Sequence, residues 1–474
     1  MEFNSREFLF FLPIAAGVVH LCPAKLRISL ALVLSWLFYS WGHPRFLIPL
    51  LLVTLLTQGV LEIMWRRPAL RRTALVLGLC GSGFIIGLYK IPWLTKGFAE
   101  SLQTTGDHTV TLLPLGLTFY AFQSVSLMFE VKRNHWRKRL TLIDTALYLS
   151  FFPQLLAGPI VRPQELVPEL RNRLGRPTRF DLLLGVEFLL TGLFKKVVLA
   201  DTAWRVIDSN LESGWHIAAF VLMIPIYSYA DVAGYNDMAK GSAAWLGVTL
   251  PENFREPVTR TRSWADFWKR HHITVMRWMR DYVYLPVRGR GKSRRPQWLA
   301  TVVTLALMGL WHGFDPVWVL FGGGIGLLMV VEVAFIRWRG QRREASPRAR
   351  RITDRKRSAL PAPVRVAVVS WERCRGPLWV YGSAIALGAL VIAATGVSLF
   401  PRSGTNRVSA GDGLLLAAAS FLVVAALDRR RIMTRSGLKD FEPTVVKALV
   451  AGAMTVAIIV FAPQPSPTFI YLTV

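Results

Sequence analysis

Two histidines stand in apolar surroundings, where an imidazole ring needs a partner. His272 lies in a segment rich in Trp and Phe, and His312 ends an apolar run inside Gly309-Leu310-Trp311-His312-Gly313. Imidazole takes or donates a proton near neutral pH, and an ionisable group in an apolar interior is a functional candidate because leaving it unsatisfied costs free energy. His272 and His312 are therefore either a catalytic acid–base pair or two hydrogen-bonded structural histidines.

Other catalytic constellations are missing from the sequence. It contains no GxSxG, HExxH or GxxxxGK[ST] motif. His271 and His272 are adjacent, and adjacent side chains on a helix point about 100° apart, which is awkward for joint metal binding. Cys22, Cys80 and Cys374 are too widely spaced for a disulfide framework or a Cys-x-x-Cys site. We expect neither a metal site nor redox chemistry.

The composition places the chain in a membrane. Of its 474 residues, 53% are hydrophobic and 17 are Trp, whereas a soluble protein averages about 45–50% by a count that includes Gly. An ordinary cytoplasmic enzyme is therefore excluded. The 57 Lys and Arg against 29 Asp and Glu give a net charge of +28. These basic residues gather between apolar runs, which is typical of membrane topology signals and not of nucleic-acid binding.

Apolar runs recur along the whole chain. A helix needs about 20 apolar residues to cross the bilayer. The long runs are Phe46–Trp65, Thr73–Tyr89, Leu112–Phe129, Leu182–Leu199, Val317–Trp338, Leu378–Leu399, Gly413–Leu427 and Val445–Phe461. Shorter runs, which are tilted spans, re-entrant pieces or buried helices, are Phe8–Leu21, Ile28–Trp41, Ala146–Val161, Ile217–Tyr229 and Leu299–His312. The predicted fold is an all-α polytopic membrane protein with about 10–13 transmembrane or partly buried helices. We attribute the Gly322-Gly323-Gly324 run to close helix packing.

Clusters of Lys and Arg predict the orientation, because cytoplasmic loops retain positive charge. The richest cluster, Arg337–Arg357, is placed in the cytoplasm. Counting the later spans from it puts the C-terminal segment Ala462–Val474 outside the cytoplasm. The cluster Arg66–Arg72 is also placed inside, and counting back from it puts the N-terminus outside.

The segment Tyr229–Gln297 is too polar to cross lipid and too aromatic for a plain loop. Projecting Arg262–Tyr282 on a single helix predicts an amphipathic element that lies in the membrane interface. His272 falls in the middle of its apolar arc. The apolar arc holds Trp264, Trp268, Val275, Met276 and Met279, and the basic arc holds Arg262, Lys269, Arg270, Arg277 and Arg280. An interfacial helix accounts for the Trp and Arg residues and leaves His272 unexplained.

Six short motifs occur in the order seen in membrane-bound O-acyltransferases. They are Phe151–Arg162, Gly234–Ala239, Pro251–Phe254, Phe267–Ile273, Arg280–Pro286 and Gly309–Gly313. The chain resembles this family from roughly Phe8 to its C-terminus, and it is most similar to the bacterial branch that contains the membrane subunit of alginate O-acetylation. The resemblance implies helices around a central funnel, with amphipathic and re-entrant helices, where an acyl thioester enters from the cytoplasm and an acceptor from outside.

The resemblance also implies roles for the histidines. His312 matches the family's catalytic histidine, and His272 matches its second polar position. His271 stands where relatives commonly carry Trp, and alignment to Ile273 assigns the second role to His272. Transfer from a thioester to a hydroxyl needs a base for the proton and donors for the oxyanion. We assign the base to His312 and the supporting role to His272.

Five further residues are candidates for supporting or substrate-binding roles. Asn236 and Asp237 could orient the catalytic groups, or they could be polar contacts in helix packing. Arg162 and Arg280 could bind the phosphates of a coenzyme A donor, although interfacial arginines would look the same. Trp311, which precedes His312, is the fifth candidate.

The predicted reaction is O-acetylation at the bacterial inner membrane, in which the multi-pass protein is embedded in lipid. The donor is acetyl-CoA or another acyl thioester, with no permanently bound cofactor. The acceptor is an extracytoplasmic polysaccharide, either an alginate-like exopolysaccharide or peptidoglycan, reached through a periplasmic SGNH-type acetyltransferase partner. The alternatives are a polysaccharide or lipid transporter, or a scaffold without catalysis. A transporter predicts internal repeats, and the two halves of the sequence are not similar.

The C-terminal tail carries a candidate acyl acceptor, Tyr471. Pro463, Pro465 and Pro467 predict a stiff, extended arm after Phe461. The ending is similar to a Phe-x-Tyr-x-x-Phe motif associated with acyl relay in this family, matched at Phe469 and Tyr471 but with Val474 in place of the last Phe. A phenol has a pKa of about 10, so its ester is a better acyl donor than an alkyl ester. The alternative is an interfacial anchor.

We expect one domain over residues 1–474 with five parts. These are N-terminal helices in 1–142, catalytic core helices in 143–336, a basic cytoplasmic loop in 337–376, C-terminal helices in 377–461 and an extracytoplasmic tail in 462–474.

Overall fold

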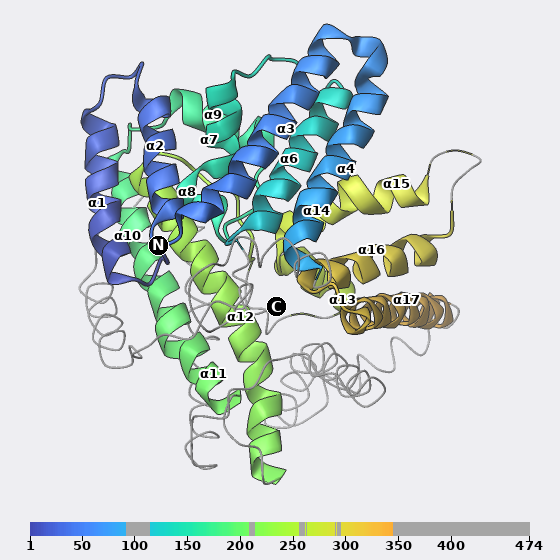
Figure 1. Ribbon diagram of the computed structural model, residues 1–474. Coiled ribbons are helices and arrows are strands. Elements are labelled where there is room, and N and C mark those ends of the chain that lie inside the picture. The colour runs from blue at the N-terminus through green and yellow to red at the C-terminus, as the bar shows by residue number, and fades with distance from the viewer. Residues whose placement is uncertain are drawn as a thin grey trace. The chain divides into compact units, whose positions relative to one another are not determined.

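A computed structural model describes residues 1–91, 114–207, 214–255, 261, 263–289, 291 and 295–344. The regular structure in these ranges is helical, with no β-strand (Figure 1), as the sequence predicted. The described residues belong to two compact units, Met1–Glu252 and a second that begins at Asn253. The runs Leu378–Leu399, Gly413–Leu427 and Val445–Phe461, most of the basic loop and the tail with Tyr471 lie outside the described residues.

The first unit begins with helices that follow the predicted apolar runs. Helices α3, α4 and α6 pack against one another (Figure 1). Two short 3-10 turns, η1 and η2, precede α3 and α4 and begin with a proline, whose fixed φ suits a helix start. The bounds are α1 Arg6–Leu21, α2 Arg27–Ser40, η1 Pro44–Phe46, α3 Leu47–Arg66, η2 Pro68–Leu70, α4 Arg71–Lys90 and α6 Leu117–Lys132.

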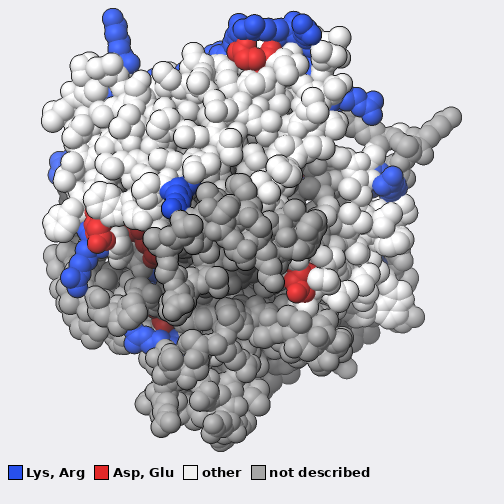
Figure 2. Space-filling model, in the orientation of Figure 1, with Lys and Arg blue, Asp and Glu red and all other residues white. Residues whose placement is uncertain are grey.

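Within the described residues, three helical stretches are long and apolar enough to cross a membrane: Pro44–Arg66, Pro68–Lys90 and Pro316–Trp338. Their outer faces expose large apolar side chains, such as Leu55 at 57% and Val331 at 62%. Extended apolar surface is unusual in water and suits contact with lipid. On the face shown in Figure 2 the described residues are mostly uncharged, and Lys and Arg gather over the end of α3 and the start of α4. The chain is thus a membrane protein.

The run Ala146–Val161 forms two short helices and a buried loop instead of one helix. Helix α7, Leu142–Ser150, ends where Phe151 leaves the helical conformation, and α8 covers only Phe152–Leu155. The Tyr148 hydroxyl donates to the Val161 carbonyl at 2.8 Å, and the Gln154 amide donates to the Tyr148 carbonyl at 3.0 Å. These bonds close the loop before α9, Pro163–Asn172. Of the predicted alternatives, the structure supports a buried element here.

Helices α10 and α12 enclose a set of buried charges. Helix α10, Arg179–Leu193, continues through a π-helical turn η3, Phe194–Ala200, into α11, Asp201–Ile207, and these pack against α12, Gly214–Trp245. The Lys196 ammonium lies 2.8 Å from Asp201 and 2.9 Å from Asp231, and Lys195 lies 3.1 Å from Asp237. We call these five residues, Lys195, Lys196, Asp201, Asp231 and Asp237, the buried ion network.

The buried ion network explains why α12 continues past Tyr229, where the sequence becomes polar. Asp231 and Asp237 of α12 face lysines from η3, so their carboxylates are paired inside the protein instead of facing lipid. A π-helical turn adds a residue to a helix, and here it accompanies two consecutive lysines that both pair with α12. The change in composition after Tyr229 therefore marks a polar interface between helices and not the end of a helix.

The second unit contains α13 to α17, of which α16 and α17 form a helical hairpin (Figure 1). The predicted continuous helix over Arg262–Tyr282 is wrong. Helix α13 ends at Arg270, His272 adopts a left-handed conformation with φ 53°, and a new helix begins at Ile273. The bounds are α13 Trp264–Arg270, α14 Ile273–Met279, the π-helical turn η5 Arg280–Tyr284, α15 Leu285–Arg288, α16 Gln297–His312 and α17 Pro316–Glu344.

Glycines bring the two helices of the hairpin into backbone contact. A Cβ atom on Gly309 would lie 2.0 Å from the Trp318 carbonyl oxygen, and one on Gly322 would lie 2.2 Å from the Leu305 carbonyl oxygen. Neither position can accept a methyl group unless the helices separate. The packing role expected for the Gly322-Gly323-Gly324 run is confirmed at Gly322.

The buried ion network yields a stability prediction. Lys196→Met leaves Asp201 and Asp231 buried without their common cation, and removing one partner of a buried ion pair costs about 3–5 kcal/mol. We expect a clear fall in the midpoint of thermal unfolding in detergent. The control is Lys25→Met, which removes an exposed lysine. Equal midpoints for the two variants would contradict a stabilising role of Lys196.

Candidate active site

His272 is buried at a break between two helices. Its side chain is 3% exposed, and its backbone occupies the left-handed region at the start of α14. This region is unfavourable for a residue with a Cβ atom, and such residues persist only where their surroundings hold them. The neighbouring contacts therefore have to fix the conformation of His272.

Asn253 supplies these contacts. Its backbone carbonyl accepts from the Ile273 N–H at 2.9 Å. Its side-chain Oδ1 accepts from the Thr274 N–H at 2.9 Å and from the Thr274 hydroxyl at 2.8 Å. Its Nδ2 lies 3.4 Å from Nδ1 of His272. Asn253 thus caps the first turn of α14, satisfying N–H groups that have no partner within the helix.

Aromatic rings enclose both adjacent histidines. His271 stacks on Phe267 with ring centroids 4.6 Å apart and meets the edge of Phe254 at 5.0 Å. His272 lies 5.8 Å from Phe254. Burial lowers the pKa of His272 to about 4, and burial together with the nearby His272 lowers the pKa of His271 to about 3. Both rings are therefore neutral at pH 7.

His312 is the last residue of α16, at the tip of the hairpin. Its ring stacks on Trp318, with centroids 5.7 Å apart and an interplanar angle of 26°. Asp315 shapes the turn, because its carboxylate accepts from the Val317 N–H at 2.8 Å. A positive charge on His312 would lie at the carboxyl end of a helix, where the helix dipole favours cations. That position suits a base that becomes charged during a reaction.

Trp311 contacts both histidines. Its ring centroid lies 6.1 Å from His272 and 4.7 Å from His312, and its side chain is buried. The structure thus places His272 of the α13–α14 break and His312 of the hairpin on a shared indole. We call His272, Trp311 and His312 the histidine cluster.

Glu332 ties the start of α13 to the hairpin. It is a buried residue of α17, and its Oε2 accepts from the Trp264 backbone N–H at 2.8 Å. Sequence reasoning did not select Glu332 or Asn253. The available signals were a lone carboxylate within the apolar run Val317–Trp338 and an amide in the Pro251–Phe254 motif.

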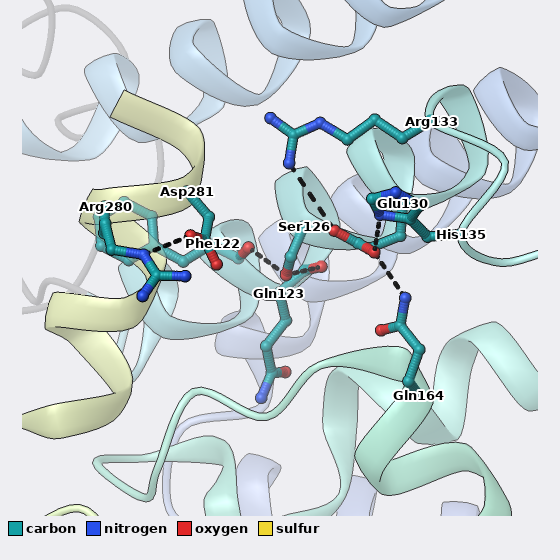
Figure 3. Close-up of polar contacts among 9 residues, drawn as sticks. All are labelled: Phe122, Gln123, Ser126, Glu130, Arg133, His135, Gln164, Arg280 and Asp281. Carbon is teal, nitrogen blue, oxygen red and sulfur yellow. Dashed lines mark hydrogen bonds and ion pairs between the residues drawn. The ribbon is translucent and has the colours of Figure 1, made fainter. Parts of the chain in front are cut away.

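The structure places three other predicted residues in the first unit and one in the second. Asn236 and Asp237 are buried in α12, and Asp237 pairs with Lys195 of the buried ion network. Arg162 precedes α9, and its backbone N–H donates to Glu165 at 3.3 Å. Arg280 pairs with the adjacent Asp281 at 2.8 Å (Figure 3). Tyr471 lies outside the described residues.

Figure 3 also shows the contacts of Glu130, a buried residue near the end of α6. Oε2 of Glu130 accepts from Gln164 of α9 at 2.5 Å and lies 3.2 Å from Nδ1 of His135. Arg133 lies 4.0 Å from the other carboxylate oxygen. These contacts join α6 to α9, so we interpret the Glu130 set as structural.

The histidine cluster supplies a base and hydrogen-bond donors. Among the residues that the structure describes, no group of three or more His, Cys, Asp or Glu side chains could hold a metal ion. Two imidazoles and an indole can move a proton and stabilise a developing negative charge. Acyl transfer to a hydroxyl requires these two functions.

Comparison with known proteins adds independent information. The profile of the membrane-bound O-acyltransferase family matches residues 33–353. A probable alginate O-acetylase, AlgI, of Pseudomonas putida is 33% identical over 353 residues, which cover 70% of this chain and 71% of the relative. A peptidoglycan O-acetyltransferase of Helicobacter pylori is 28% identical and covers 70% of each chain. A teichoic acid D-alanyltransferase of Bacillus subtilis is 26% identical and covers 47% of this chain and 60% of the relative.

The hairpin that carries Trp311 and His312 yields a packing prediction. Gly309→Ala would place a methyl group 2.0 Å from the Trp318 carbonyl oxygen, so the helices must separate. Overpacking of this kind costs about 1–3 kcal/mol, and we expect a lower midpoint of thermal unfolding in detergent. The matched control is Gly323→Ala, whose new methyl meets only the Cβ atom of Ala306 at 3.7 Å. If both variants have the same midpoint of thermal unfolding as the wild type, the hairpin does not depend on this close approach.

Proposed function

We propose that this chain, which belongs to the membrane-bound O-acyltransferase family, moves acetyl groups onto a polysaccharide outside the cytoplasm. The observation that carries the proposal is the histidine cluster, in which Trp311 contacts both His272 and His312. The relatives named as alginate O-acetylase and peptidoglycan O-acetyltransferase support acetyl as the group and a polysaccharide as the acceptor.

His312 is the general base in this proposal. It takes the proton of the acceptor hydroxyl while the oxygen attacks the thioester carbon. The tetrahedral intermediate then collapses, the carbon–sulfur bond breaks, and His312 returns the proton to the leaving thiolate. Neutral imidazole is regenerated, so each transfer consumes one thioester and releases one thiol.

His272 supports the reaction as a hydrogen-bond donor. Its low pKa keeps the ring neutral at pH 7, and a neutral imidazole carries one N–H. A fixed N–H directed at a developing oxyanion stabilises the transition state without rearrangement. Trp311 contacts both rings.

The proposed donor is acetyl-CoA from the cytoplasm, which acts as a substrate and not as a resident cofactor. Arg162 and Arg280 are the candidates for its phosphates. The Arg280 side chain is 67% exposed beside Asp281, so its guanidinium is accessible to a ligand. Asn236 and Asp237 remain candidates for supporting roles within α12.

The proposed acceptor route ends outside the cytoplasm. The chain would lie in the bacterial inner membrane with both termini on the outer side. Tyr471 would accept the acetyl group as an aryl ester and pass it to a periplasmic SGNH-type acetyltransferase, which would acetylate an alginate-like exopolysaccharide or peptidoglycan.

Single histidine variants test the assignment. We expect His312→Ala to lower polysaccharide O-acetylation by about 10²–10⁴-fold, because general base catalysis contributes this much. His272→Ala should lose about 10²–10³-fold, the usual contribution of one oxyanion donor, and His271→Ala should lose less. The measurement is the acetyl content of the polymer in cells that carry only the variant, at matched protein levels.

His43→Ala serves as the control, because His43 is an exposed residue between α2 and η1. It should leave acetylation at the wild-type level. Normal acetylation in His312→Ala would overturn the base assignment. A greater loss in His271→Ala than in His272→Ala would move the supporting role to His271.

A further inference from the structure

We propose that Asn253 is a positioning residue that holds the proton of His272 on Nε2 and so makes this ring a hydrogen-bond donor. The inference rests on the proposed function, in which His272 donates a hydrogen bond. Hydrogen bonds from Thr274 determine the orientation of the Asn253 amide, and the Asn253 amide in turn determines the tautomer of His272. All of the residues involved belong to the second unit.

First, contacts with Thr274 determine the orientation of the Asn253 side chain. The backbone N–H of Thr274 can only donate, and it lies 2.9 Å from Oδ1 of Asn253. An amide rotated by 180° would point its own N–H₂ group at this N–H and at the Thr274 hydroxyl. The Thr274 contacts therefore fix the oxygen toward α14 and the nitrogen toward His272.

The second step is the tautomer of His272. Nδ2 of Asn253 carries only N–H donors, and it lies 3.4 Å from Nδ1 of His272. Nδ1 must accept this hydrogen bond, so it carries no proton. In a neutral imidazole the proton then lies on Nε2, because the bond made by one ring nitrogen determines the state of the other.

The third step is the fixed direction of the ring. Helix α13 ends at Arg270, and the left-handed backbone of His272 starts α14 two residues later. The Asn253 carbonyl accepts from the N–H of the next residue, Ile273, at 2.9 Å. With Nδ1 against Asn253 and the ring in a T-shaped contact with Trp311, the His272 ring has a defined orientation. The strained backbone of His272 thus occurs together with a ring whose Nε2–H direction is fixed before substrate binds.

A simple capping role and a tautomer role predict different results for one variant, Asn253→Asp. Asp caps helices as well as Asn does, so its carboxylate can still accept from the Thr274 N–H. The same carboxylate cannot donate to Nδ1 of His272. It instead favours a proton on Nδ1, which leaves Nε2 as an acceptor at neutral and alkaline pH.

The experiment compares full-length wild type and Asn253→Asp in detergent, and it measures the rate of thiol release from acetyl-CoA as the acetyl group is transferred. We expect a similar midpoint of thermal unfolding, an unchanged KM for the thioester and a loss of about 10²-fold in kcat, as for one lost oxyanion donor. A carboxylate beside His272 also favours the imidazolium, in which both nitrogens carry protons. The ratio of wild-type to variant kcat should therefore shrink as the pH falls from about 8 to about 5.5.

We compare the ratio of wild-type to variant kcat because protonation of the base, His312, lowers the kcat of both proteins equally. Within the described part of the chain, His271 is a titratable residue in ring contact with His272, with centroids 6.1 Å apart. Its pKa of about 3 keeps it neutral over the range tested.

Thr274→Val is the matched control. It removes the hydroxyl from the Asn253 contact and keeps the backbone N–H, which alone fixes the amide orientation. Its kcat should stay within about threefold of wild type. Equal losses in Thr274→Val and Asn253→Asp, or full activity of Asn253→Asp at pH 8, would overturn the inference. Failure of the proposed function is distinguishable, because the wild-type protein itself would then transfer no acetyl group.

Nitrogen NMR of protein labelled with ¹⁵N-histidine gives a second measurement that does not depend on activity. His272→Gln identifies the His272 signals by their loss. We expect a protonated Nε2 in wild type and a protonated Nδ1 in Asn253→Asp at pH 8. A protonated Nδ1 in wild type would also overturn the inference.

Discussion

The hydrogen bonds of Asn253 hold a sharp break between α13 and α14, and the histidine cluster depends on this break. A continuous helix over Arg262–Tyr282 would carry His272 on a regular apolar face. The left-handed residue His272 instead separates two short helices. Asn253 accepts hydrogen bonds from the N–H groups that have no partner within the first turn of α14. The same amide contacts the imidazole. One buried side chain thus links the backbone path to the chemical state of the ring.

The same constraint operates in the first unit. In a membrane protein, buried polar groups need partners inside the protein, because lipid offers none. Lys195 and Lys196 meet this need by pairing with α12 and α11 at a π-helical turn, and Glu130 meets it through Gln164. In the second unit, Glu332 is paired with the backbone of Trp264. Charged residues within apolar helices therefore position neighbouring elements in this protein.

The sequence was sufficient to predict the helical membrane fold, because runs such as Phe46–Trp65 are set by local composition and reappear as α3. It also placed His272 in an apolar environment, which the structure confirms. The break before α14 was not predicted from the sequence, because helical periodicity assumes a continuous helix and cannot reveal a left-handed residue. The partners Asn253 and Glu332 were not selected because both act through backbone groups distant in sequence, 21 and 68 residues away. The roles assigned to His312 and Tyr471 remain predictions.

We propose that the histidine cluster moves an acetyl group from a thioester to an oxygen. The most direct measurement is incubation of the purified full-length protein with radiolabelled acetyl-CoA, followed by intact-mass and peptide analysis. We expect thiol release and an acetyl adduct on the terminal peptide in wild type. The adduct should be absent in Tyr471→Phe and in His312→Ala. Labelling that persists unchanged in His312→Ala, or the absence of any thioester turnover by the wild type, would show that the histidine cluster does not perform this transfer.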